Sequence, residues 1–362
     1  MKAYYRAILI LGICGSLCGC GGPAGYQRKE TDTASIKSRF EIPEMIETEL
    51  ADNITIKAQV TIPQNAKSGT VTCAIGKPMD FSGMEEKLRT TFFAGSQDAV
   101  FETAGDTVSL AADSVWLGYN ELRDFVLNSR EMEQRLNCIS VGGAIETSNA
   151  RQYLEKENLP FMDQKEVLQL VQKELGELGI HIGSVEVCYV MDYETMRQQE
   201  DTTNAAGILK PELAKEQWSE QDDTYYFFMH QEYHGMPVIY NPYSGQGFLP
   251  GEECTVMVSE KGIIGCHVAG CYSWSEGEEA VLLPMEKVLK TLKDHYGNDL
   301  VTHYEITSAD FYMDILPKSD GTAELRPVWS FLAEKTGEGI EDFYTVNIVI
   351  DGETGQELTE NF

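Results

Sequence analysis

Basic residues are scarce in this sequence and acidic residues are abundant. Its 362 residues include 28 Lys and Arg against 58 Asp and Glu, which gives a formal net charge of −30 at pH 7. Nucleic-acid binding needs basic patches that neutralise phosphates, and anionic lipid attracts the same patches. The composition therefore excludes nucleic acid as a partner. It indicates a solvated acidic surface, with a cationic partner or loosely held divalent ions as the alternative.

Several common catalytic motifs are also missing. No serine stands in Gly-x-Ser-x-Gly or Ser-x-x-Lys, and neither Gly-x-x-x-x-Gly-Lys nor Gly-x-Gly-x-x-Gly occurs. These absences speak against the usual serine hydrolases and phosphate-binding loops. The sequence therefore assigns no catalytic residue and no cofactor, and a non-enzymatic role is the better prediction.

No Cys-x-x-Cys pair is present, although the chain has nine cysteines. Cys14 and Cys18 belong to the N-terminal leader, which leaves Cys20 and the following six: Cys73, Cys138, Cys188, Cys254, Cys266 and Cys271. Their irregular spacing speaks against a zinc site. Six cysteines allow 15 disulfide connectivities, and sequence cannot choose among them. We favour mostly free, half-buried thiols, and we expect Cys266 and Cys271 on opposite faces of one strand over 263–272.

What the sequence does contain is a clear leader. Lys2 and Arg6 precede a short apolar run over 7–13, too short to span a bilayer, as in a secretory signal over 1–19. Leu17-Cys18-Gly19-Cys20 resembles the lipobox of bacterial lipoproteins. The resemblance implies that Cys20 is acylated and holds the protein on the outer face of the cell membrane. An ordinary cleaved signal is the alternative. Residues 20–40 are rich in Gly, Thr, Ser and charge and are typical of a flexible tether.

Hydrophobic periodicity divides the remainder into three parts. We predict an N-terminal α+β domain over 41–150, in which 53–60 alternates as a strand and 82–93 and 121–136 are helices. Residues 160–275 and 283–362 each begin with an amphipathic helix and continue with strands. The predicted fold class is α+β, with two repeated units of a helix packed on an antiparallel sheet.

The repeated units resemble a known family. Gln231-Glu-Tyr-His-Gly235-Met-Pro237-Val238, followed by Val256-Met-Val-Ser-Glu-Lys-Gly262, is similar to the PepSY-type unit of secreted bacterial proteins. Arg326-Pro-Val-Trp-Ser-Phe331 resembles a part of the Yyc-type extracytoplasmic regulatory proteins of Gram-positive bacteria. The resemblance implies modules that modulate a protease or a sensor kinase, without catalytic residues.

Two histidines, His230 and His234, suggest a metal site at first sight. On a strand, four residues span roughly 13 Å, which is too far for two ligands of one ion. The order His-Gln-Glu-Tyr-His also differs from the zinc-protease motif His-Glu-x-x-His. We therefore predict no metal site, with His230 as a side chain on a sheet.

The strand over 225–233 is unusually aromatic. We predict an interaction surface formed by Tyr225, Tyr226, Phe228, His230 and Trp329. The alternative is a central strand that neighbouring elements bury on both faces.

Two functional hypotheses follow from these observations. The first is a lipid-anchored extracytoplasmic protein that binds and modulates a protein or peptide partner. The second is a hydrolase of cell-wall or peptide material, which would need two carboxylates that converge in a deep cleft.

Overall fold

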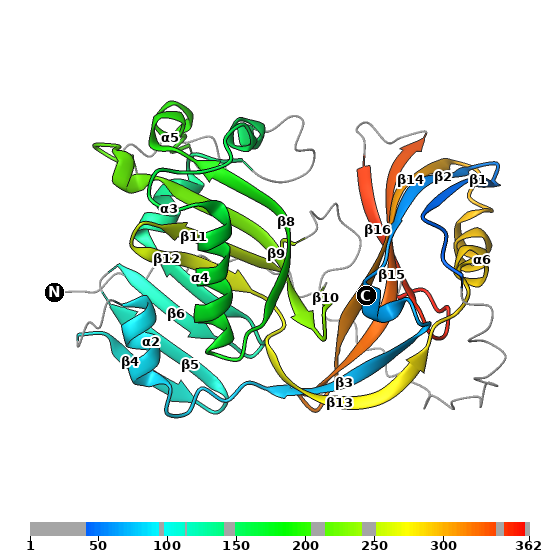
Figure 1. Ribbon diagram of the computed structural model, residues 1–362, viewed down its shortest axis with the longest axis horizontal. Helices are drawn as coiled ribbons and strands as arrows, with labels where there is room; N and C mark the ends of the chain where they lie inside the picture. The colour runs from blue at the N-terminus through cyan, green and yellow to red at the C-terminus, as the bar shows by residue number, and fades with distance from the viewer. Residues whose placement is uncertain are drawn as a thin grey trace.

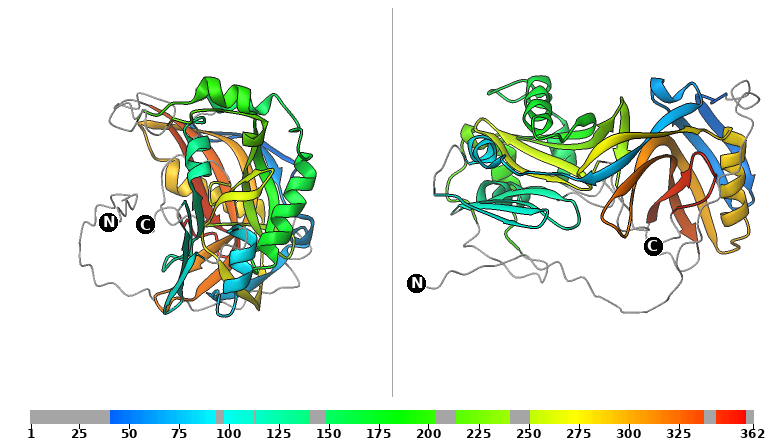
Figure 2. Two further views of the ribbon diagram at one scale, coloured as in Figure 1. Left: turned by 90° about the vertical axis from the view of Figure 1, so that its left-hand side faces the viewer. Right: turned by 90° about the horizontal axis from the view of Figure 1, so that it is seen from below.

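The computed structural model describes residues 41–93, 98–112, 114–140, 149–203, 214–240, 251–337 and 344–358. Strands dominate these residues, and sixteen of them join in one mixed sheet. The sheet is folded into two halves that lie side by side (Figure 1 and the right-hand view of Figure 2). The predicted signal, Cys20 and the tether lie outside the described residues, so the lipid anchor stays a prediction.

The helical half, on the left in Figure 1, is an antiparallel sheet with helices on both faces. Its strands are β4 (Val100–Ala104), β5 (Thr107–Ala112), β6 (Val115–Tyr119), β7 (Phe125–Ser129), β8 (Ile182–Met191), β9 (Thr224–Tyr233), β11 (Cys254–Ser259) and β12 (Gly262–Val268). Its helices are α2 (Glu85–Phe92), α3 (Arg130–Leu136), α4 (Gln164–Gly176) and α5 (Tyr193–Gln199), with 3₁₀ turns at Asn149–Leu154 and Glu220–Asp222. Apolar residues at helical spacing on α2 and α4 pack on one face, and α3 and α5 cover the other.

The curved half, on the right in Figure 1, wraps strands around a second core, with α6 on its outer side. Its elements are β1 (Met45–Ala51), β2 (Ile54–Thr61), β3 (Thr70–Pro78), β13 (Tyr272–Val281), β14 (Thr302–Pro317), β15 (Ala323–Gly337), β16 (Tyr344–Asp351), α6 (Met285–Tyr296) and a 3₁₀ turn at Gln64–Ala66. The alternation predicted for 53–60 is confirmed in β2, where Ile54, Ile56, Ala58 and Val60 are buried.

One short strand, β10 (Met236–Ile239), links the two halves. It pairs antiparallel with β9 of the helical half and parallel with β14 of the curved half. The backbone hydrogen bonds of the sheet therefore continue from one half into the other.

The predicted fold of an N-terminal domain followed by two helix-on-sheet units is wrong. The chain forms one large mixed sheet, and sequence-distant strands are neighbours in it: β2 pairs parallel with β14, and β3 pairs with β13 and β15. Periodicity identified many strands and both long helices, but it carries no information on which strands pair. The fold implied by the PepSY-type resemblance, a helix packed on a separate antiparallel sheet, is wrong for the same reason.

Pairing also divides the expected unit over 41–150. Residues of β1, β2 and β3 belong to the core of the curved half, whereas α2 and β5 to β7 belong to that of the helical half. Within this unit, the helix predicted over 121–136 is only partly present, because 125–129 forms β7 and α3 begins at Arg130.

No disulfide joins the six cysteines from Cys73 onward. Only Cys73 and Cys188 are partly exposed, and the other four are buried rather than half-buried as expected. The expectation for Cys266 and Cys271 is wrong in its premise, since β12 ends at Val268 and β13 begins at Tyr272. Both thiols lie in the core of the helical half, together with Cys254.

Among the residues that the structure describes, no helix is long and apolar enough to cross a membrane.

Candidate functional site

The residues predicted as an interaction surface are buried. Tyr225 and Trp329 are 0% exposed, Phe228 is 1% exposed and Tyr226 is 6% exposed. Tyr225 lies in the core between the sheet and α4, Tyr226 and Phe228 lie on the opposite face, and Trp329 lies in the core of the curved half. They therefore form no exposed surface, and β9 is the buried central strand that the sequence left as the alternative.

His230 is the predicted site residue that leads to a candidate site. On β9 it follows Tyr226 and Phe228 at two-residue spacing, and its side chain is fully buried. Its Nδ1 contacts Oε1 of Glu253, and its Nε2 lies 2.8 Å from Oε1 of Glu186. The imidazole is therefore held between two carboxylates.

Two irregular features of the backbone near His230 place the carboxylates of Glu186 and Glu253 beside its ring. Glu186 lies at an irregularity in the pairing of β8 with β9. Glu253 follows Gly251, whose φ is +84° and whose hypothetical Cβ would lie 2.9 Å from the backbone of Phe228 and Met229. Only glycine combines this conformation with such a close approach, so Gly251 lets the chain pass against β9 and place Glu253 on His230.

The two glutamates decide the protonation of His230. Burial alone would lower its pKa, but the attraction of Glu253 and Glu186 and their hydrogen bonds raise the pKa of His230 to about 9. At neutral pH the ring is an imidazolium with both nitrogens protonated. Such a ring has no lone pair and cannot act as a general base.

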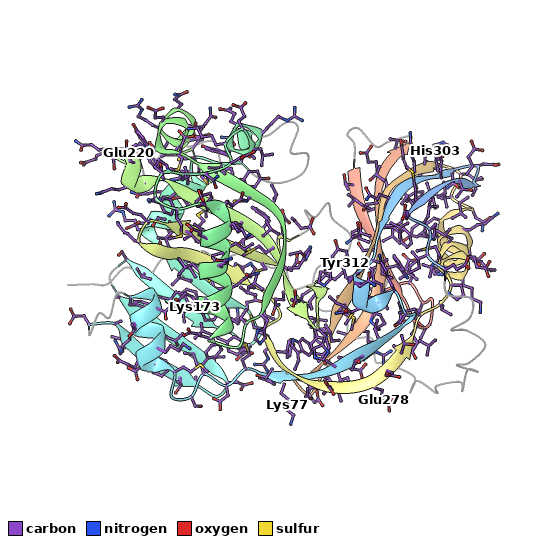
Figure 3. The ribbon with its side chains drawn as sticks, viewed as in Figure 1. Lys77, Lys173, Glu220, Glu278, His303 and Tyr312 are labelled. Carbon is purple, nitrogen blue, oxygen red and sulfur yellow. The ribbon has the colours of Figure 1, made fainter. Side chains whose placement is uncertain are left out.

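A small pocket lies against His230 where β9 and β10 meet the curved half. We call it the junction pocket; it is lined by His230, Ile239, Ser308, Asp310, Tyr312, Ser330, Leu332 and Asn347. It encloses about 320 Å³ of empty space, part of it open to solvent. Tyr312, labelled in Figure 3, lies on the side of the curved half next to β10, with its ring centroid 5.1 Å from that of His230.

Strand register explains the polar lining. Ser308, Asp310 and Tyr312 alternate along β14 on the face opposite the core of the curved half. Asp310 is directly opposite Ser330 of β15, and the Ser330 hydroxyl donates a hydrogen bond to Oδ1 of Asn347 on β16, at 2.5 Å. Three neighbouring strands thus contribute polar groups to one small area.

Two aspartates near the pocket have a pKa above the ordinary value. Burial raises the pKa of Asp310, and Glu186 adds to this, while the hydroxyls of Ser308 and Thr61 and the charge of His230 act against it. Burial also raises the pKa of Asp314 to about 8, with smaller contributions from Asp351 and Glu253. The residues that line the pocket include no Lys or Arg that would favour the ionised carboxylates.

The two histidines do not converge. His234 lies in the turn between β9 and β10, with a φ of +52°, and its ring stacks on Tyr233 at 4.2 Å between centroids. In the described parts of the chain, no group of three or more His, Cys, Asp or Glu side chains could hold a metal ion.

The sequence pointed to His230 but missed Glu186, Glu253, Asp310 and Tyr312. These residues come from β8, the segment before β11, and β14, and only the folded sheet brings them together. One signal was readable: Asp310, Tyr312 and Asp314 place polar groups at every second position of an otherwise apolar strand.

Comparison with known proteins gives a fold likeness. No family model matches the chain, and no curated protein matches it. A solved structure of an uncharacterized protein from Eubacterium rectale ATCC 33656 is similar, with a TM-score of 0.59 and 19% sequence identity over 87% of this chain and 93% of that one. At this identity the likeness concerns the fold alone.

Proposed function

We propose that this chain is an extracytoplasmic lipoprotein that binds a protein or peptide partner at the junction pocket, without catalysing a reaction on it. The observation that carries the proposal is the clamped imidazolium of His230. It leaves the most obvious acid–base residue of the pocket without a nitrogen that can accept a proton. The pocket retains hydroxyl, amide and carboxylate groups, which are suited to binding.

The hydrolase alternative is less well supported by the same geometry. Glycoside or peptide hydrolysis by an acidic pair needs two carboxylates that both face the substrate. Glu186 and Glu253 are engaged by His230, which leaves Asp310 as the carboxylate that lines the pocket.

The anchor rests on the lipobox-like sequence that ends at Cys20. Fractionation of cells that express Cys20→Ala tests it. We expect the variant to lose stable membrane attachment, because the lipid supplies the apolar area that holds the protein. Cys18→Ala is the matched control and should stay with the membrane. Equal distribution of the two variants would contradict the anchor.

Photocrosslinking in intact cells tests the binding role. A photoreactive residue in place of Leu332, which lines the pocket, should give a discrete adduct with a partner. The same residue in place of Lys173, on α4 of the helical half in Figure 3, should not give that adduct. The same adducts from both positions, or none from Leu332, would count against the proposal.

A further inference from the structure

The junction pocket has an apolar side and a polar side. Ile239 and Leu332 supply aliphatic wall, while Ser308, Asp310, Ser330 and Asn347 supply oxygen atoms. Register brings the polar groups together, since Ser308 is opposite Leu332 on β15 and Leu332 is opposite Asn347 on β16. A ligand that fits both sides has an apolar stem and a polar head.

The net charge of the site indicates that the polar head of the ligand is a cation. Three carboxylates, those of Glu186, Glu253 and Asp310, surround the single imidazolium of His230, so that full ionisation leaves two negative charges uncompensated. No Lys or Arg is among the residues that line the pocket. Oε2 of Glu253 is buried and has no hydrogen-bond partner in the part of the chain that is described. A cation in the pocket would offset the excess negative charge of the three carboxylates.

The small size of the pocket favours a compact cation over a wide one. The pocket is small, since its empty space of about 320 Å³ includes space that is open to solvent. An ammonium is compact and has three donors, whereas a guanidinium is a wide planar fork. The described residues also offer no three-ligand set for a metal ion.

We propose that the junction pocket binds a primary ammonium on an unbranched alkyl stem, as presented by a lysine side chain or a free alkyl diamine. The carboxylate of Asp310 and the oxygens of Ser308 and Asn347 receive the ammonium. Ile239 and Leu332 contact the stem. This inference rests on the proposed binding function and names the chemical class of its ligand.

Calorimetry on the full-length chain in detergent tests the inference with small probes. N-acetyl-lysine methylamide should bind, and its ε-acetylated form, which lacks the charge, should bind at least tenfold more weakly. The corresponding arginine derivative should also be weaker, because its head is wider. Equal binding of the acetylated and charged probes would overturn the inference.

Variants locate the site. Asp310→Asn keeps the shape of the side chain but removes its charge, and it should weaken lysine-probe binding at least tenfold. Glu305→Gln removes a charge from an exposed position of the same strand and should leave binding unchanged. Circular dichroism of both variants shows whether the fold is kept. A folded Asp310→Asn variant with unchanged affinity would refute the site.

The source of the ammonium is decided by comparing 1,5-diaminopentane with a lysine-containing peptide. Tighter binding of the peptide identifies a protein partner, and tighter binding of the diamine identifies a free amine. Crosslinking from Leu332 that persists while no amine binds would leave the proposed function intact and reject this inference alone. Loss of both would reject the two together.

Discussion

At His230, two opposed electrostatic effects act on one buried side chain. Removing a charge from water disfavours the imidazolium, and two adjacent carboxylates favour it. The carboxylates prevail, since the pKa is raised to about 9 rather than lowered. The same charges leave neither ring nitrogen with a lone pair that could accept a proton.

Replacement of His230 by Gln should lower the free energy of unfolding by about 3–5 kcal/mol at neutral pH, because Glu186 and Glu253 lose their shared cation. The pKa of His230 is raised on folding, so its contribution is fully present below about pH 6.5 and is lost as pH rises through about 9. Of the groups close to the same ring, Asp310 has a raised pKa, and burial raises the pKa of Tyr312 above the range of this experiment. Urea unfolding of both proteins from pH 6 to 10 should show the difference shrinking. A constant difference would contradict a charged His230.

The contribution of Asp314 to the free energy of unfolding should also decrease as pH rises. Burial raises its pKa to about 8, so its protonated form stabilises the fold at low pH and this contribution is lost as pH rises through 8. Asp314→Asn should therefore gain stability relative to the wild type between pH 4 and 8, on the order of 2–5 kcal/mol. Thermal unfolding across that range measures the gain. Parallel pH profiles for the two proteins would show that Asp314 is ionised in the fold.

At the scale of single elements, the sequence predicted what depends on local pattern. The alternation in β2 and the helical spacing in α4 and α6 are present. The strand predicted over 225–233 is present as β9, but the surface predicted on it is buried. Local pattern identifies a strand, whereas burial on both faces depends on partners from elsewhere in the chain.

The candidate site was predictable only in part for the same reason. His230 stood out because of its residue type. Glu186 and Glu253 are two of 58 acidic residues, and nothing in the sequence sets them apart. Their contact with His230 depends on the irregular pairing of β8 and on the conformation of Gly251.

The contact between α3 and β12 offers a test of element packing. A Cβ on Gly265 would clash with Sδ of Met132, so Gly265→Ala should push α3 away from the sheet. Overpacking of this kind costs about 1–3 kcal/mol. The double variant Gly265→Ala with Met132→Ala should lose less stability than the sum of the single variants. Strict additivity in denaturant unfolding would contradict the contact.

At the scale of the whole molecule, the first strands of the chain complete the core of its last ones. β2 runs parallel to β14 in the curved half, more than 240 residues apart in the chain, as the hydrogen bond from Asn53 Nδ2 to the carbonyl of Thr302 shows. This non-local pairing places strands from both ends of the described chain in one core.

Ile56→Ala tests this arrangement. Ile56 is 0% exposed in the core of the curved half, and its truncation should cost about 2–5 kcal/mol. Hydrogen exchange should accelerate in β14 and β15, with a smaller effect in β5 and β6 of the helical half. Faster exchange confined to residues 41–150 would instead support a separate N-terminal domain.

The measurement that tests the account most directly is ¹⁵N NMR of the His230 ring in the folded chain at pH 7. A clamped imidazolium predicts that both ring nitrogens are protonated, and that they stay so until the pH approaches about 9. This result would support a pocket that binds a partner without proton transfer. A ring with one deprotonated nitrogen at pH 7 would contradict it, because His230 could then act as a general base and the hydrolase alternative would gain support.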